Sequence, residues 1–224
     1  PPNMIGRYAA LSYFGMVPAA IMGLDLDRLW ENAQRMVDAC GSTIPGQAHP
    51  GVNLGAILGA IGKQGRNKVC IFCSQSIATF GNWAEQLIAE SLGKQGQDLI
   101  PVVGATVGKP HDYATDRVFV YLRVDDDPDI VEMDAAVKML REAGHPRITQ
   151  RLPDPYAIAG EFFRWQYAIA VAGVLMKINP FDEPNVDEAK DATNRLLEQY
   201  QADGHLPVDE PAMVRDNIQL YTNS

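Results

Sequence analysis

Apolar residues recur along this chain in two patterns, one typical of helices and one typical of buried strands. Spacings of three and four predict helices over 15–23, 26–40, 53–61, 82–94, 129–143, 154–177 and 186–203. Short continuous or alternating apolar runs predict strands over 68–74, 99–103, 116–124 and 146–152. Strands that alternate with helices predict a layered α/β fold around a mostly parallel sheet.

The predicted strand over 68–74 is apolar from Val69 to Cys73, as expected of a parallel strand that is covered on both faces. Pro101 indicates that the strand over 99–103 lies at an edge or ends there, because proline cannot donate a backbone hydrogen bond. Cys70 and Cys73 are three residues apart on one strand, so they are predicted to point to opposite faces. A shared metal or a disulfide between them is therefore not expected, and with Cys40 they fit buried thiols in a reducing compartment.

Composition narrows the class of protein. The chain has 224 residues, of which 46% are apolar, enough for one large α/β domain or one domain with a helical appendix. Its net charge is −9 and no dense Lys/Arg cluster appears, which argues against nucleic acid as the main ligand. No apolar run reaches ~18 residues, so no membrane span is expected, and no signal segment is evident. We therefore expect a cytoplasmic protein.

The helix over 82–94 carries the strongest candidate for catalysis. Phe80, Trp83, Leu87 and Ser91 fall on one side of it. Gln86 and Glu90 are four apart, so they stand one above the other on another strip of the same helix. Such a carboxylate, oriented by an amide one turn earlier, can serve as a general base. The alternative is an ordinary solvated helix face.

Two loops resemble phosphate sites in part. The segment Gly104-Ala-Thr-Val-Gly-Lys109 has the wrong glycine spacing for a phosphate-binding loop, and Pro110 stands where Ser or Thr is needed. The segment from Ser74 to Thr79 joins a strand to a helix and fits either a phosphate cradle or ordinary capping residues. No metal site is predicted, because the four histidines lack metal-ligand spacing: His49, His111, His145 and His205.

Three segments carry a resemblance to a known family. They are Ile5-Gly-Arg-Tyr-Ala-Ala-Leu-Ser-Tyr-Phe-Gly-Met-Val-Pro-Ala-Ala, then Trp83-Ala-Glu-Gln-Leu-Ile-Ala-Glu-Ser-Leu-Gly-Lys, then Asn179-Pro-Phe-Asp-Glu-Pro-Asn-Val-Asp-Glu-Ala-Lys. In this order the chain resembles phosphoglucose isomerase, in particular the C-terminal part of the bifunctional transaldolase/phosphoglucose isomerase type.

The resemblance implies a fold and an assembly. The family has two sugar-isomerase (SIS) domains, each a three-layer, doubly wound, flavodoxin-like α/β sheet, and this chain resembles the second. Residues 1–150 would form the SIS domain and residues 151–224 a helical segment packed on it. The start Pro1-Pro2-Asn3 indicates a chain cut from a longer one, in which an N-terminal SIS domain supplies the phosphate-binding loop. The family also implies a homodimer and neither a metal nor an organic cofactor.

The resemblance also assigns roles to residues. Glu90 would be the base that moves a proton between C2 and C1 of the open-chain sugar phosphate, and Gln86 would contact the substrate. Arg7 would stabilise the enediolate, since arginine keeps its charge at physiological pH. Lys190 would assist ring opening, with His111 as a further candidate whose Lys-Pro-His-Asp-Tyr surroundings match the family poorly.

Glu183 departs from the family, which usually has Gln at this substrate-binding position. A carboxylate there would repel an anionic substrate unless it is paired, and Lys190, seven residues later, is the expected partner.

The expected function is the interconversion of glucose 6-phosphate and fructose 6-phosphate. One alternative is a SIS sugar-phosphate-binding or regulatory module without turnover. Another is an assembly partner that buries the aromatic helix over 154–177 against a second chain, although its aromatic residues are more often core: Phe162, Phe163, Trp165 and Tyr167.

Overall fold

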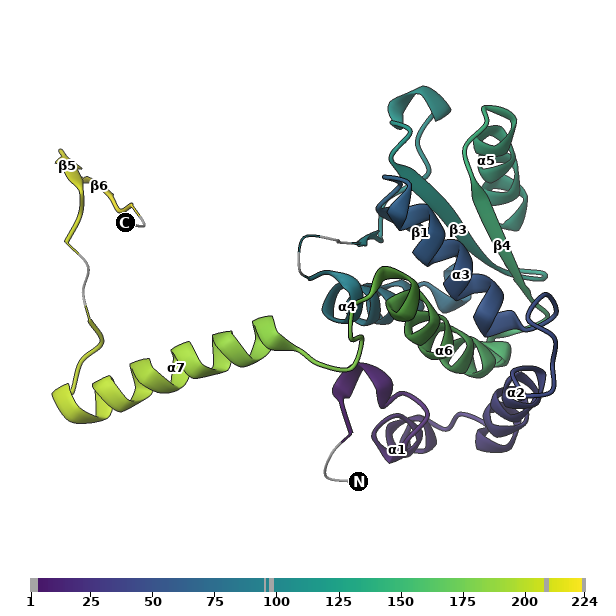
Figure 1. Ribbon diagram of the computed structural model, residues 1–224, viewed down its shortest axis with the longest axis horizontal. Coiled ribbons are helices and arrows are strands. Elements are labelled where there is room, and N and C mark those ends of the chain that lie inside the picture. The colour runs from purple at the N-terminus through teal and green to yellow at the C-terminus, as the bar shows by residue number, and fades with distance from the viewer. Residues whose placement is uncertain (1–3, 95, 97–98, 208–209, 223–224) are drawn as a thin grey trace. The chain divides into compact units, whose positions relative to one another are not determined.

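A computed structural model describes residues 4–94, 96, 99–207 and 210–222 (Figure 1). The chain divides into two compact units, Pro1–Asp182 and Glu183–Ser224. The start Pro1-Pro2-Asn3, which indicated a chain cut from a longer one, lies outside the described residues.

The first unit is built on a four-stranded sheet in which every pairing is parallel. Its strands are β1 (Lys68–Cys73), β2 (Ile100–Val102), β3 (Arg117–Val124) and β4 (Arg147–Leu152). Their order is β2-β1-β3-β4, so β2, which contains Pro101, lies at an edge as predicted. The α/β fold with a doubly wound parallel sheet is confirmed.

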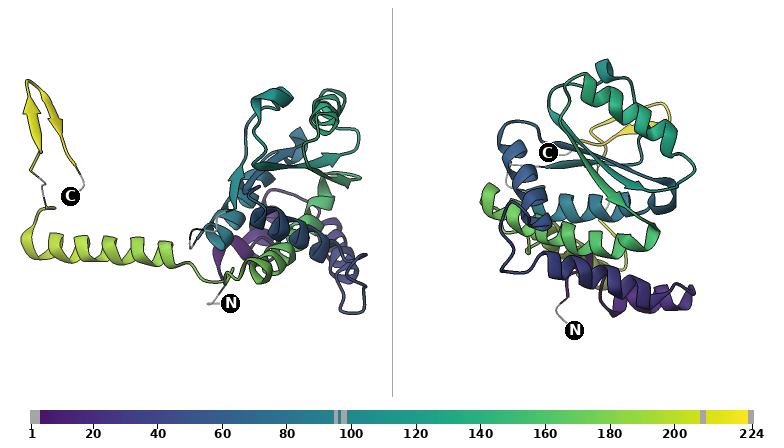
Figure 2. Two further views of the ribbon diagram at one scale, coloured as in Figure 1. Left: turned by 45° about the horizontal axis from the view of Figure 1, so that its top comes forward. Right: turned by 90° about the vertical axis from the view of Figure 1, so that its right-hand side faces the viewer.

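Helices cover both faces of this sheet (Figure 2). One face packs on α3 (Pro50–Lys63), α4 (Phe80–Leu92) and α6 (Ile158–Met176), and the other packs on α5 (Ile130–Glu142). Beyond α6 lie α1 (Tyr13–Ile21) and α2 (Leu26–Ala39), which bury small residues against it. Cys70 faces α5 while Cys73 packs toward the opposite core, so the prediction that the two thiols point to opposite faces is confirmed. All three cysteines are free.

The aromatic helix α6 lies in the core of the first unit. Trp165 is fully buried and its indole Nε1 donates to Gln150 Oε1 at 3.1 Å. Phe162 packs edge-on against Trp83 of α4, with ring centroids 4.7 Å apart. The helix approaches α3 so closely that a Cβ added to Gly55 would meet Ala168 O at 2.3 Å. These contacts place α6 within the compact unit Pro1–Asp182.

The second unit contains α7 (Pro184–Asp203), β5 (Met213–Arg215) and β6 (Ile218–Leu220). The two strands pair antiparallel as a hairpin that the sequence pattern did not predict, because each has only three residues and both are exposed. Asp216 adopts a φ of 52° at the turn between them. Among the described residues, no helix has the length and apolar character needed to cross a membrane.

Glu161 is a buried carboxyl on α6, and it gives the first unit a pH-dependent stability. Its side chain lies 3.2 Å from Arg164, but burial dominates and raises its pKa from 4.5 to about 7. Between these two pH values the folded state holds a proton that the unfolded state has lost, so the free energy of unfolding falls as pH rises. We expect Glu161→Gln to raise the free energy of unfolding at pH 8 by about 3 kcal/mol and to raise the melting temperature with it.

The measurement is thermal unfolding at pH 8 and at pH 5, with the exposed Glu31→Gln as the control variant. At pH 5 the folded wild type already carries a neutral Glu161, so the two melting temperatures should nearly agree. A lower melting temperature of Glu161→Gln at pH 8 would mean that the ion pair with Arg164 outweighs the cost of burying the charge.

Candidate active site

The helix α4 turns one side to the core and another toward solvent, as its sequence predicts. Phe80, Leu87 and Ser91 are buried, while Gln86 is exposed. Glu90 lies between these extremes, with 28% of its side chain exposed. A carboxylate at this depth is accessible from outside and still fixed by neighbours.

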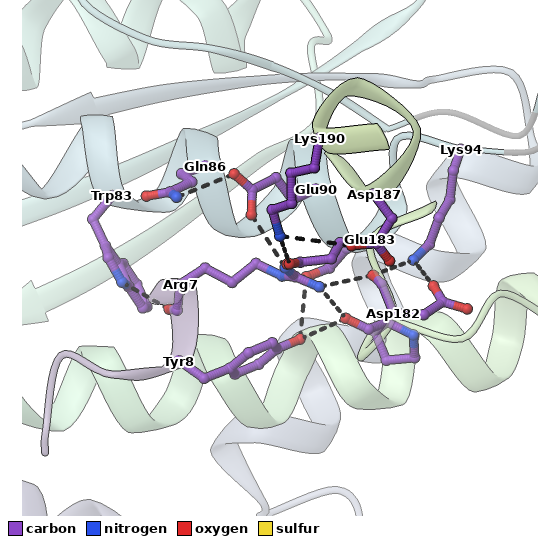
Figure 3. A network of polar contacts seen from close by, with 12 residues as sticks. Arg7, Tyr8, Trp83, Gln86, Glu90, Lys94, Asp182, Glu183, Asp187 and Lys190 are labelled. Atoms are coloured by element: carbon purple, nitrogen blue, oxygen red, sulfur yellow. Dashed lines mark hydrogen bonds and ion pairs between the residues drawn. The ribbon is translucent and has the colours of Figure 1, made fainter. Parts of the chain in front are cut away.

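Two side chains hold the carboxylate of Glu90, one on each oxygen (Figure 3). Gln86 Nε2 donates to Glu90 Oε1 at 3.1 Å, and Arg7 Nη1 donates to Glu90 Oε2 at 3.1 Å. The predicted stacking of Gln86 and Glu90 is therefore observed, and Arg7, 83 residues earlier, completes the arrangement.

Arg7 is buried completely, with 0% of its side chain exposed. It lies in the short 3-10 helix η1 (Gly6–Tyr8), and its guanidinium also donates to Ser91 Oγ at 2.9 Å. Further hydrogen bonds run from Arg7 Nη2 to the carbonyls of Pro180, at 3.2 Å, and Asp182, at 2.9 Å. A buried guanidinium needs such acceptors. Because they lie in α4 and in the segment after α6, Arg7 connects both to the start of the chain.

Three residues that the sequence analysis did not select support this cluster. Tyr8 Oη donates to Pro180 O at 3.1 Å and lies 3.1 Å from Ser91 Oγ, and burial raises the pKa of Tyr8. Lys94, which is also buried, pairs with Asp182 and holds the pKa of that carboxyl below its usual range. All three stand inside the segments that carry the family resemblance, and this was the only signal in the sequence.

Lys190 and Glu183 belong to the second unit and are described within it. Lys190 Nζ lies 3.2 Å from Glu183 Oε1 and 3.6 Å from Asp187 Oδ1. The predicted pairing of Glu183 with Lys190 is therefore observed, and it raises the pKa of Lys190.

The structure does not bring His111 to Glu90. His111 lies in η3 (Pro110–Asp112), with 76% of its side chain exposed. His145 contacts Pro110 O at 3.0 Å, and Tyr113 packs on Phe119 in the core beneath α5. Because α4 covers the other face of the sheet, His111 and Glu90 are on opposite sides of it.

The segment from Ser74 to Thr79 is bound by the chain's own groups. Ser74 Oγ accepts from Val124 N at 3.0 Å, and Ser76 donates to the Asp127 carboxylate from both its backbone N, at 3.1 Å, and its hydroxyl, at 2.8 Å. A carboxylate in this position repels phosphate, so the phosphate-cradle interpretation is not supported. No cluster that could hold a metal occurs among the residues that the structure describes.

Comparison with known proteins shows which proteins this chain is similar to. No family model matches the chain. A glucose-6-phosphate isomerase from Rubrobacter xylanophilus is 31% identical over 86% of this chain and 53% of its own length. A probable glucose-6-phosphate isomerase from Haloarcula marismortui is 24% identical over 96% of this chain and 56% of its own length. Both of these relatives are named as glucose-6-phosphate isomerases, the second as a probable one. The chain spans about half the length of these curated relatives.

Solved structures show the same fold. A hypothetical protein from Thermus thermophilus matches with a TM-score of 0.75 at 24% identity, over 86% of this chain and 55% of that one. A glucose-6-phosphate isomerase from Chlamydia trachomatis matches with a TM-score of 0.68 at 13% identity, over 88% of this chain and 47% of that one. Sequence relatives thus support the glucose-6-phosphate isomerase family, and the solved structures show that the fold is shared.

Proposed function

We propose that this chain is the C-terminal SIS domain of a glucose-6-phosphate isomerase and carries its catalytic base, Glu90. The observation that carries the proposal is the carboxylate of Glu90, held between Gln86 and the buried Arg7 and still partly exposed. A solvated helix face has no need of a buried arginine beside its carboxylate. The relatives named glucose-6-phosphate isomerase support the reaction class.

In the proposed reaction, Glu90 removes the proton from C2 of open-chain glucose 6-phosphate, and the electron pair forms an enediolate across C1 and C2. The proton of the C2 hydroxyl passes to the oxygen on C1, and the same carboxyl returns the first proton to C1, which gives fructose 6-phosphate. The proton moves between adjacent carbons and no electron leaves the substrate, so the step needs neither a metal nor an organic cofactor. Arg7 fixes the position of Glu90, and its charge favours the anionic intermediate.

Gln86, Lys190 and Glu183 have supporting roles in this proposal. Gln86 orients Glu90 and, being exposed, is available to a substrate hydroxyl. Lys190, paired with Glu183, assists ring opening by exchanging a proton with the ring oxygen. The pairing also reduces the repulsion that the Glu183 carboxylate exerts on an anionic sugar phosphate.

The rest of the site is proposed to come from outside this chain. We infer that an N-terminal SIS domain binds the phosphate, that a transaldolase domain belongs to the same parent chain, and that the protein is a homodimer. Its three free cysteines fit a cytoplasmic location. Because binding of the remote phosphate contributes to catalysis, this chain alone is expected to have weak activity or none.

The test is a coupled assay of fructose 6-phosphate conversion by the full-length protein. Turnover that survives addition of a chelator supports the isomerase proposal. Binding of fructose 6-phosphate without turnover would instead favour a sugar-phosphate sensor, which the carboxylate of Glu183 in place of Gln would then explain.

A further inference from the structure

A pocket lies between α5 and the strands β3 and β4, on the face of the sheet opposite α4. It has a volume of about 520 Å³, within the usual range for small-molecule sites. Its lining contains five cationic side chains and one carboxylate: Arg123, Lys138, Arg141, Arg147, Arg151 and Asp134. Such a concentration of positive charge stands out in a chain whose net charge is −9.

The sequence of β4 builds one wall of this pocket by alternation. Arg147, Thr149 and Arg151 point to the face of α5, while Gln150 between them points to the opposite face and bonds to Trp165. In the register of the sheet, Thr149 lies beside Tyr121 of β3, which also lines the pocket. An apolar core is expected between a helix and a sheet, and here arginines replace it at the edge strand.

Several of these charges have no counterion within the described part of the chain. Arg123 is paired with Asp134 and Asp125, and Lys138 lies 3.7 Å from Glu142. Arg141, Arg147 and Arg151 line the same pocket, and no ion pair is formed by any of them among the residues described. Three unneutralised guanidinium groups around one hollow repel one another, and a bound anion would remove that cost.

Two buried hydroxyls add hydrogen-bonding capacity. Tyr121 Oη and Thr149 Oγ1 are buried without a hydrogen-bond partner of ordinary geometry in the described residues. Tyr121 is 1% exposed, and burial raises its pKa to about 12, an effect that the nearby Ser74 hydroxyl reduces only in part. The phenol therefore keeps its proton at neutral pH and can donate. A buried hydroxyl that lacks a well-formed hydrogen bond is costly, and a polar ligand in the pocket would remove that cost.

We propose that this pocket binds a small phosphorylated metabolite, with its phosphate held by the arginines and its polar body by the hydroxyls of Tyr121 and Thr149. Guanidinium groups bind phosphate oxygens in pairs of parallel hydrogen bonds. The pocket is several times larger than a phosphate group, so it has room for the rest of a small metabolite. It lies across the sheet from Glu90, and the proposal stands independently of the isomerase function.

The test measures the accessibility of single arginines in the full-length protein. Phenylglyoxal modifies accessible arginines, and peptide mass spectrometry reports the rate at each position. Inorganic phosphate is the probe, sodium chloride of equal ionic strength is the control for screening, and the exposed Arg35 of α2 is the internal control. We expect phosphate, and not chloride, to slow modification of Arg147 and Arg151 about tenfold or more relative to Arg35.

The variant Thr149→Val preserves the shape of the side chain and removes only the hydroxyl. We expect it to raise the phosphate concentration for half-protection about tenfold, since a hydrogen bond to a charged group is lost. Equal rates at Arg147, Arg151 and Arg35 with and without phosphate would overturn the proposal. So would arginines that resist modification even without phosphate, because another part of the protein would then cover the pocket.

Discussion

Replacing Glu90 with Gln is expected to lower kcat for glucose 6-phosphate isomerisation by about a hundredfold to ten-thousandfold. An amide cannot accept the proton from C2, yet it keeps the shape of the carboxylate and can still accept a hydrogen bond from Arg7. Affinity for the sugar phosphate should therefore change little. The measurement is the coupled assay on the full-length protein, with calorimetry of fructose 6-phosphate binding.

Glu85→Gln is the matched control for this experiment. Glu85 is an exposed carboxylate on the same helix α4, one turn before Ala89, and it makes no contact with Arg7 among the described interactions. The control should retain full activity. Activity of Glu90→Gln within a few-fold of the wild type would show that a different residue is the base and that Glu90 has a structural role.

Replacing Arg7 with Met is expected to lower the free energy of unfolding by roughly 3–5 kcal/mol, the usual scale for breaking a buried charged pair. The variant removes the buried guanidinium that donates a hydrogen bond to Ser91, to the carboxylate of Glu90 and to two backbone carbonyls. The measurement is urea denaturation followed by circular dichroism, which gives the unfolding free energy directly.

Arg35→Met is the control, because Arg35 is exposed on α2 and its pair with Glu31 is a surface contact. Its effect should stay within about 0.5 kcal/mol. If Arg7→Met were no less stable than this control, the hydrogen bonds of Arg7 would contribute little to folding. Arg7→Lys separates charge from geometry: it keeps the charge, but it should lower kcat because an ammonium cannot reach Glu90, Ser91 and the carbonyls together.

Much of the fold follows from the sequence pattern alone. The apolar runs at 68–74 and 116–124 become β1 and β3 in the middle of the sheet, and Pro101 marks an edge strand. These features are local, so a single sequence contains them. The hairpin of β5 and β6 was missed because its strands are short and exposed, and an apolar pattern carries no signal where nothing is buried.

The site could be predicted only in part, for a physical reason. Gln86 and Glu90 are four residues apart on one helix, so the spacing predicts their contact. The contacts of Arg7 span 84 residues to Ser91 and 173 to Pro180, and no local pattern encodes such a pairing. The family resemblance selected Arg7, but it also offered His111, which the fold places on the other face of the sheet. Lys94 and Asp182 were found only once the chain was folded.

The large sequence separation between Arg7 and its hydrogen-bond partners also affects the order in which the protein folds. Its hydrogen bonds to Pro180 and Asp182 close a loop that contains nearly all of the first unit, and closing such a loop costs entropy that shorter contacts avoid. During synthesis, α4 and its carboxylate leave the ribosome about ninety residues before Asp182 does. A nascent chain can thus form much of its sheet while Arg7 still lacks its last acceptors. The arrangement around Glu90 is therefore expected to be among the last parts of the first unit to form. Its formation would indicate that this unit has folded completely.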